Sequence, residues 1–558
     1  MLDALFRPVL LIALVTAAAG PWFVIALLRP TLCRSGLTLS HLDPIERRVV
    51  SIAKAAAWIA LIVGLPELYL QVVDIMGGTL FSGVEFSVVW RLLTRTNAGW
   101  VWIGRSILVA ALLVMLATSR EFGQTTARSW PWSRIRWLTV LVLAASALTS
   151  RILASHATAL VSGSLIAMAS DALHILAATS WIGLLIYFRL LLGRMRELEA
   201  ATTQPVLAPI VNRITPIALG SAGVLIGSGV YNATQHLDSL RAIIASPYGL
   251  TLLAKMLLLL PVLVAGSLNF LVIRPALKSA GPSEKPSGEG RARLASRLLS
   301  LVEIEVSVGA AILALAAVLS VVPPAVDDPR GTLSLSRLSD LFRPRLPRFS
   351  SPGLGPGPWP ALQQTADDFA YSEFNHNWAG AALIVMAIGS FLEGVSVRRF
   401  RWARHWPMVF VLLAVFLFVR NDPEAWPFGP VGFLESMRIP EMVQHRLSVV
   451  LVLALGWVEY LGRGGHVRQS RWAYIFPSLC LVGGFMLFGH THDLGVAADD
   501  SQTYIALQHG VMATFALLAG LSRWFQLRHR DEGRWFGRLW PLFVFLLGLQ
   551  MFVFYKEM

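Results

Sequence analysis

Long apolar stretches recur along the whole chain and are separated by short polar segments. A helix needs roughly 20 mainly apolar residues to cross the hydrocarbon core of a bilayer. The pattern therefore predicts fourteen membrane-spanning helices, near residues 8–28, 51–73, 101–118, 136–153, 166–188, 212–231, 250–273, 300–322, 376–394, 406–420, 440–460, 472–490, 502–522 and 539–555.

The apolar pattern is interrupted once by a long segment rich in Pro, Gly, Ser and charged residues. We therefore predict an all-α, polytopic membrane protein with an eight-helix domain over 1–322, a linker over 323–375 and a six-helix domain over 376–558. The first apolar stretch is long and is preceded by one basic residue, Arg7, so we expect a retained helix and not a cleaved signal.

The overall composition agrees with a membrane protein and excludes other classes. Hydrophobic residues make up 55% of the 558 residues and charged residues only 14%, whereas soluble proteins have roughly 25% charged residues. Water-soluble enzymes, disordered chains and fibrous proteins are therefore excluded. The two cysteines, Cys33 and Cys480, are too few for a disulfide framework or a cysteine-based metal site.

The net charge of +14 indicates the orientation of the helices. In a soluble protein such an excess would suggest a nucleic-acid surface. Here 30 of the 47 Lys and Arg residues lie in the seven odd-numbered loops between the predicted spans. Basic residues in short loops stay on the cytoplasmic side. We therefore expect both termini and the linker to face outward, with lipid and not nucleic acid as the surrounding partner.

This orientation places eight of the twelve histidines in outer loops or in the outer third of a span. The other four lie among polar residues of inner loops, where we expect solvent exposure: His41, His405, His466 and His529. Histidines within a bilayer usually face a bundle interior or a cavity. Each outer histidine could be a simple interfacial residue, but they fall into two groups, one in each domain. We therefore predict two outer-face metal sites.

In the first domain, the candidate ligands are His156, at the end of the fourth span, and His174, within the fifth. Asp171 precedes His174 by three residues, so both lie on one helix face. A carboxylate beside a ligand histidine fixes its tautomer and raises its basicity. The structural alternative is an Asp–His hydrogen bond that only stabilises the start of the helix.

In the second domain, five histidines from four helix ends could meet on the outer face: His376, His445, His490, His492 and His509. Supporting groups are Glu441, Asp493 and Met512. Imidazole with carboxylate suits Cu(II), Zn or Ni, and a thioether shifts the preference toward copper, Cu(I) included. Pairs of these histidines could alternatively be the axial ligands of haem b, which would make the protein a membrane redox protein.

Five charged residues lie inside apolar stretches: Glu67, Arg105, Lys255, Glu303 and Glu305. Such residues are costly in a bilayer and mark an ion pathway or a buried pair. The first three fall toward the outer half and could share one polar network, whereas the last two lie near the inner end of the eighth span. Structural pairing and snorkelling to the interface are the alternatives.

Four stretches resemble the CopD/PcoD copper-resistance family, which includes YcnJ-like copper-uptake proteins: SHA at 155–157, DALHILAATSWIGLL at 171–185, SPYGLTLLAKMLLLLPVLVAGSLNFLVIRPAL at 246–277 and LLSLVEIEVSVGAAILALAAVLSVVPPA at 298–325. The second half is similar to the C-terminal membrane region of longer members, through HWPMVFVLLAVFLFVRNDPEAWPFGP, PEMVQHRL and GHTHD. The resemblance implies a bacterial inner-membrane protein that takes up periplasmic copper, with a CopC-like carrier as a partner. His156 and His174 fall on the family-like motifs.

Several functions stay open at this level. The residues support an outer-face copper site, but no Met-x-x-Met series along a span supports passage of copper through the bilayer. No phosphate-binding loop is present, so ATP hydrolysis in this chain does not drive transport. Metal handling or transport is favoured over an enzymatic activity. The alternatives are a redox protein with haem b or copper, and a copper sensor or stability factor.

Overall fold

The structure is a computed structural model in which residues 3–34, 43–76, 80, 85–118, 130–154, 164–195, 200–279, 288–328, 332–353, 366–396, 398–462, 471–488, 500–529 and 535–557 are described. These ranges are helices and their connections, with a single isolated β-bridge between Ala425 and Val431. The all-α fold expected from the apolar pattern is confirmed.

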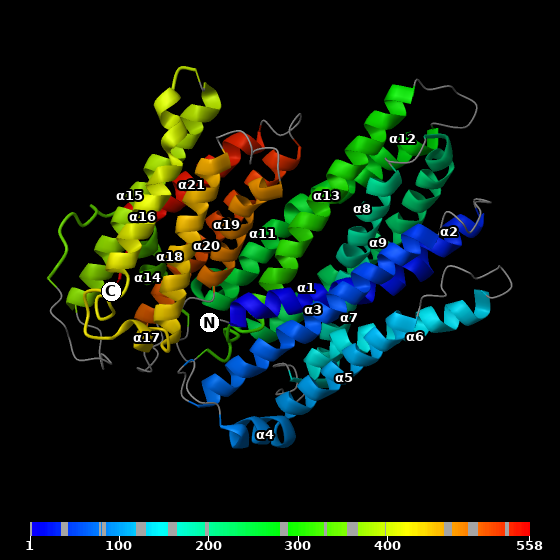
Figure 1. The fold of residues 1–558 in the computed structure, drawn as a ribbon, viewed down its shortest axis with the longest axis horizontal. Helices are drawn as coiled ribbons and strands as arrows, with labels where there is room; N and C mark the ends of the chain where they lie inside the picture. Colours follow the sequence, from blue (N-terminus) through cyan, green and yellow to red (C-terminus); the bar gives the residue numbers. More distant parts are fainter. Residues whose placement is uncertain are drawn as a thin grey trace.

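The first domain consists of helices that correspond to the eight predicted spans (Figure 1). Short π-helical turns interrupt three of these spans without ending them. In chain order the elements are α1 (Asp3–Phe23), η1 (Val24–Leu28), α2 (Arg29–Arg34), α3 (Asp43–Ile75), α4 (Phe86–Arg95), α5 (Asn97–Ala117), α6 (Trp130–Thr149), η5 (Ser150–Ala154), α7 (Ser164–Ala178), η7 (Thr179–Gly183), α8 (Leu184–Met195), α9 (Ala200–His236), α10 (Ala242–Ala245), α11 (Pro247–Leu268), η8 (Asn269–Ile273), α12 (Arg274–Ser279) and α13 (Gly288–Leu319).

The second domain follows a short helix in the linker, α14 (Leu335–Leu341). Its elements are α15 (Ala366–Val395), η9 (Arg401–His405), α16 (Pro407–Arg420), α17 (Phe433–Ser436), α18 (Pro440–Gly462), η10 (Arg471–Tyr474), α19 (Ile475–Phe488), α20 (Asp500–Arg528), α21 (Phe536–Leu549) and η11 (Gln550–Phe554).

Twelve helices among the described residues are long and apolar enough to cross a membrane, so this is a multi-pass membrane protein. The apolar helices Pro407–Arg420 and Trp472–Phe488 are shorter and coincide with two further predicted spans. With 14 residues, α16 is about 21 Å long at the helical rise of 1.5 Å per residue. The total of fourteen crossings and the side of each terminus stay predictions.

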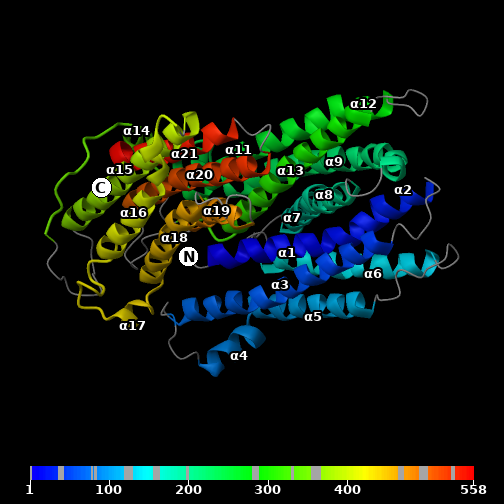
Figure 2. The same cartoon turned by 45° about the horizontal axis from the view of Figure 1, so that its top comes forward.

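The division into two membrane domains stays a prediction, and the two parts share one hydrophobic core. Buried side chains of α19 and α20, among them Phe488, Leu517 and Phe525, belong to the same cluster as the core of the first domain. Figures 1 and 2 both place α19 and α20 beside α11 and α13. The polar segment between the domains is therefore not their only connection.

The described part of the linker is docked on both domains. Leu333 and Leu338 are buried in a cluster with Ala245 of α10 and Tyr504 of α20. The Leu333 amide donates to the Ala245 carbonyl at 3.1 Å. These contacts place the end of α9, the start of α11 and the start of α20 at one end of the bundle, which is the predicted outer end.

Two glycines allow α15 and α21 to cross in backbone contact. A Cβ on Gly380 would lie 2.7 Å from the Gly548 carbonyl oxygen, and a Cβ on Gly548 would lie 2.8 Å from the Gly380 oxygen. Both obstacles are backbone atoms, which cannot rotate away.

We expect Gly380→Ala to lower the free energy of unfolding by about 1–3 kcal/mol, because overpacking forces the two helices apart. The measurement is thermal unfolding of the purified chain in detergent. Gly394→Ala is the matched control, since Gly394 lies on the same helix and a Cβ there meets nothing within 4 Å. Equal effects of the two substitutions would show that the crossing is not tightly packed.

Candidate functional site

Two of the predicted histidines meet at the predicted outer end of the second domain. His376, about three turns into α15, and His509, about two and a half turns into α20, have ring centroids 5.7 Å apart. Tyr555, which follows η11, stacks on the His376 ring with centroids 3.7 Å apart and lies 6.1 Å from His509. Three helices therefore bring two imidazoles and a phenol into one cluster, which we call the His–His–Tyr cluster.

The hydrogen bonds of both histidines define which ring nitrogen carries the lone pair. The Nδ1 atom of His376 lies 2.9 Å from the Ser372 carbonyl oxygen, and that of His509 lies 3.0 Å from the Ile505 oxygen. A carbonyl can only accept, so Nδ1 carries the proton in each ring. In a neutral imidazole the lone pair is then on Nε2. Metal-ligating histidines commonly donate their other N–H in this way.

Two buried carboxylates lie beside the His–His–Tyr cluster. Glu557 accepts hydrogen bonds from the hydroxyls of Ser372 and Tyr555, and its amide donates to Glu373 Oε1 at 3.1 Å. Arg348 pairs with the other oxygen of Glu373. The Tyr555 phenol therefore acts as a hydrogen-bond donor to a carboxylate in this cluster.

His445 has a different neighbour from the one that the sequence suggested. Its Nδ1 atom lies 2.6 Å from Asp422 Oδ1, just beyond the end of α16. The carboxylate orients this ring and leaves the Nε2 lone pair as the ligating position. Glu441 lies in the first turn of the same helix, α18, but its side chain is outside the described part of the structure. Met512 is buried one turn after His509 on α20.

In the first domain, His174 lies between α7 and α9. Its Nδ1 atom is 3.0 Å from Ser228 Oγ, whose own proton is donated to the Val224 carbonyl at 2.6 Å. The serine hydroxyl has a single proton, so it accepts from His174, and the lone pair of this ring is again on Nε2. A Cβ on Gly229 would lie 3.2 Å from the imidazole, so α9 approaches His174 closely.

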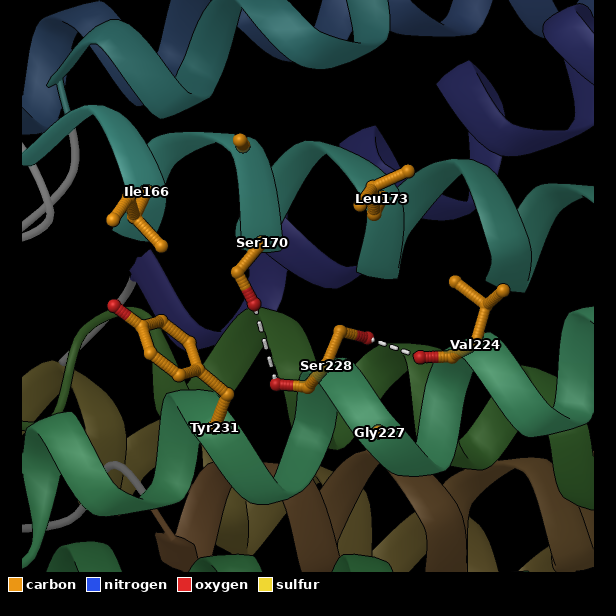
Figure 3. Close-up of a pocket in the computed structure, with 8 residues that line it drawn as sticks. Ile166, Ser170, Leu173, Val224, Gly227, Ser228 and Tyr231 are labelled. Atoms are coloured by element: carbon orange, nitrogen blue, oxygen red, sulfur yellow. Dashed lines mark hydrogen bonds between the residues drawn. The ribbon is translucent and has the colours of Figure 1, made fainter.

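A groove of about 350 Å³ opens beside this histidine, between the two helices. Figure 3 shows its apolar walls and the Ser170 side chain, whose Oγ lies 3.4 Å from the Ser228 carbonyl oxygen. The Ser170 hydroxyl donates its proton to Asn232 Oδ1 at 2.6 Å. The lining residues are Ile166, Ala169, Ser170, Leu173, Val224, Gly227, Ser228 and Tyr231. These side chains suit lipid or another apolar group better than a metal ion.

Asp171 does not act on His174 as the sequence suggested. Within the ranges that the structure describes, its hydrogen-bond partner is Asn232, whose amide donates at 2.8 Å, and no hydrogen bond joins it to His174. Lys255 of α11 lies close enough to both residues to interact electrostatically. The predicted carboxylate–imidazole pair is therefore replaced by a small network of polar and charged groups.

The charged residues within spans are divided between several places. Arg105 Nη2 pairs with Glu67 Oε2 at 2.7 Å, on α5 and α3, whereas Lys255 lies with Asp171 on other helices. They do not form the single outer network that was expected. Glu303 binds Arg189 and Arg528, and Glu305 accepts from Asn269. Because α13 begins at Gly288, both glutamates lie near its middle and not at its inner end.

Four predicted site residues lie outside the described part of the chain: His156, His490, His492 and Asp493. Among the described residues, no three side chains of His, Cys, Asp or Glu gather closely enough to hold a metal ion. The His–His–Tyr cluster thus supplies two imidazole nitrogens, and any further ligand to the same ion must come from a different residue type or from another part of the chain.

Sequence reasoning missed three side chains that define these sites: Tyr555, Asp422 and Ser228. Each comes from a helix or helix end distant in sequence from the histidine it contacts. A polar residue at a helix end, such as Asp422, is a weak signal for a histidine partner, because most such residues cap the helix or face water.

Comparison with known proteins identifies relatives of the first domain. Residues 1–165 match the family described as Copper resistance protein D-like, N-terminal domain, and residues 208–319 match Copper resistance protein D. Copper transport protein CutJ of Bacillus subtilis (strain 168) is 29% identical over 231 residues, which cover 41% of this chain and 40% of that relative. The chain thus matches less than half the length of this curated protein. No solved structure matches it significantly.

Proposed function

The chain belongs, through its first membrane domain, to the copper-resistance protein D family, and on that basis we propose that it binds copper at histidines on the outer face of the membrane. We propose, from these family matches, that the protein handles copper as a multi-pass membrane protein. Our proposal adds that the membrane is the bacterial inner membrane and that the bound copper is taken up from the periplasm.

The observation that carries this proposal is the common arrangement of the imidazoles. In His174, His376, His445 and His509, Nδ1 is the nitrogen that faces a carbonyl, hydroxyl or carboxylate oxygen. In a neutral ring of this tautomer, Nε2 carries the lone pair that can bind a metal ion. Neutral imidazole is a good ligand for copper, and a protonated ring would not be. Four described histidines, from both domains, share this arrangement, in which Nδ1 faces an oxygen atom.

The His–His–Tyr cluster is the centre of the proposed site in the second domain. Helix α19 ends at Phe488, and a Cβ on Gly510, next to His509, would lie 3.8 Å from the Phe488 ring. In sequence, the GHTHD segment that contains His490 and His492 directly follows Phe488. We propose that these histidines, with Met512 as a thioether ligand and Asp493 and Glu441 as supporting acids, complete the coordination of copper.

The first domain supplies a second proposed site, formed by His174 and His156. The Lys255 ammonium beside His174 opposes the binding of a cation, whereas the nearby Asp171 favours it. The two charges offset each other, so we expect weaker copper binding here than at the His–His–Tyr cluster. A CopC-like periplasmic carrier is the proposed donor of copper to either site.

The test is direct measurement of copper binding by the purified full chain. We expect the double variant His376→Ala/His509→Ala to lose the tightest copper equivalent, because two of its ligands are removed together. Binding is measured by titration with Cu(I) and with Cu(II) in competition with a chromophoric chelator, followed by elemental analysis. His405→Ala is the matched control, since His405 is exposed on η9 at the opposite side of the same domain.

Two outcomes would contradict the proposal. Unchanged copper stoichiometry and affinity in the double variant would show that these histidines are not ligands. A Soret band in the purified wild-type protein that disappears in the double variant would show that they bind haem b instead. Reconstituted vesicles that take up no copper would restrict the function to copper binding without transport.

A further inference from the structure

Glu305 is a carboxyl group buried near the centre of the apolar span Arg293–Leu319, with 3% of its surface exposed. Its described partners come from two other helices. The Asn269 amide donates to Oε1 at 2.6 Å, and the Trp181 indole lies close enough to this carboxyl to interact with it. Three helices therefore hold Glu305 in a fixed position inside the bundle.

Both partners of Glu305 lie on π-helical turns. Trp181 is in η7 and Asn269 is the first residue of η8. Such turns inside long helices occur frequently at functional sites. The packing here is tight, because a Cβ on Gly309 of α13 would lie 2.7 Å from Ile182 Cγ2 of η7. The two helix irregularities thus coincide with one buried polar group.

Glu305 differs from other carboxylates buried in the spans. Glu67, Glu303 and Glu459 each bind at least one arginine, at 2.6–3.1 Å. Within the part of the chain that the structure describes, no Lys or Arg contacts Glu305, whose partners are an amide and an indole. An ionised carboxylate without a counter-ion is costly in a low-dielectric interior.

The charged and titratable groups on the elements packed against α13 are occupied elsewhere. Arg189 and Arg528 bind Glu303, and Arg523 binds Glu459. Among the others, each of the following contacts a different group: Arg7 (Ser320 carbonyl), Tyr187 (Thr16 carbonyl), Lys255 (Asp171), His509 (Ile505 carbonyl) and His529 (Ser300 hydroxyl). None of these interactions is with Glu305, so its charge state depends on burial and on its polar neighbours.

These two influences oppose each other. Burial favours the neutral acid, whereas donation from Asn269 favours the carboxylate. The Asn269 amide can donate to either form, so the same surroundings can hold the carboxyl with or without its proton. The neutral form also fits the surroundings, because Asn269 Oδ1 is buried and accepts no hydrogen bond from the described residues. A protonated carboxyl supplies an O–H donor beside this amide.

From this geometry we propose that Glu305 is a membrane-embedded proton-binding site that takes up and releases a proton during the working cycle of the protein. The ligand is a proton and not a metal ion, because the described groups here offer only one carboxyl and one amide oxygen, too few for a metal site. The site is separate from the outer histidines and does not depend on their binding copper.

Infrared difference spectroscopy between acidic and alkaline pH tests this proposal on the full chain in lipid vesicles. A protonated carboxyl has a C=O band that shifts in D2O and disappears when the proton leaves. We expect wild type to show such a band, and Glu305→Gln to lose it entirely. Glu303→Gln is the matched control two residues away and is expected to keep the Glu305 band.

Asn269→Leu keeps the carboxyl and removes one donor, so we expect the band to persist at a changed frequency. This variant decides the question if Glu305→Gln does not fold. The proposal would be overturned by a wild-type spectrum without a protonated carboxyl band. It would also be overturned if Glu305→Gln and Asn269→Leu both showed the same band as wild type. Copper titration of Glu305→Gln separates the two proposals. If this variant loses the infrared band but binds copper as wild type does, both proposals are supported. If the histidine double variant loses copper binding but wild type shows no carboxyl band, only the copper site is supported.

Discussion

Replacing Glu67 by alanine is expected to lower the free energy of unfolding of the first domain by about 3–5 kcal/mol, as measured when one partner of a buried ion pair is removed. Glu67 and Arg105 are 3% and 7% exposed, and their side chains meet at 2.7 Å between α3 and α5. Without the carboxylate, the guanidinium would stay buried in the apolar bundle with no counter-charge. Thermal unfolding in detergent, followed by the intrinsic tryptophan signal, measures the loss.

The double variant Glu67→Leu/Arg105→Leu separates the cost of an unpaired charge from the value of the pair. Apolar residues of similar volume often replace a buried ion pair without loss of stability. We therefore expect the double variant to be more stable than Glu67→Ala alone. If the double variant is as unstable as the single one, the ion pair itself contributes stability and the unpaired arginine is not the cause.

The apolar pattern predicted the helices well because a helix that crosses a bilayer needs a long apolar stretch, which few other structures need. It located the helix ends less well. The polar residues GEGRARLASR at 288–297 precede the predicted eighth span, yet they lie in α13 because a helix can continue beyond the membrane. This extension places Glu303 and Glu305 near the middle of α13, whereas the apolar pattern alone placed them near the start of a span.

Partners of the polar side chains could not be predicted from one sequence. The helical period shows that Asp171 and His174 share a face, but it does not show that Asn232 and Ser228 on α9 supply their hydrogen bonds. The basic-residue count treated Arg528 as a loop charge that orients the chain. In the structure this side chain binds Glu303, a contact that depends on how the two domains pack.

The same contact leads to a second prediction with a large effect. Glu303 of the first domain binds Arg189 of α8 at 3.1 Å and Arg528 of the second domain at 2.6 Å. We expect Glu303→Ala to lower the free energy of unfolding by about 2–3 kcal/mol, between the values for exposed and fully buried ion pairs, because Arg528 is partly exposed. The expected readout is a lower unfolding temperature of the chain, with the second domain unfolding at a lower temperature than it does in wild type.

A double-mutant cycle shows whether the contact joins the domains. Glu303→Ala, Arg528→Ala and the double variant are expected to give a coupling energy of about 1–2 kcal/mol, since contacting charges are not additive. Asp340→Ala is the control, because its ion pair with Arg343 at 3.2 Å is largely exposed and is expected to change stability by less than about 1 kcal/mol. A coupling energy near zero would mean that Glu303 acts through Arg189 alone, and that the shared apolar core holds the two domains together without this ionic contact.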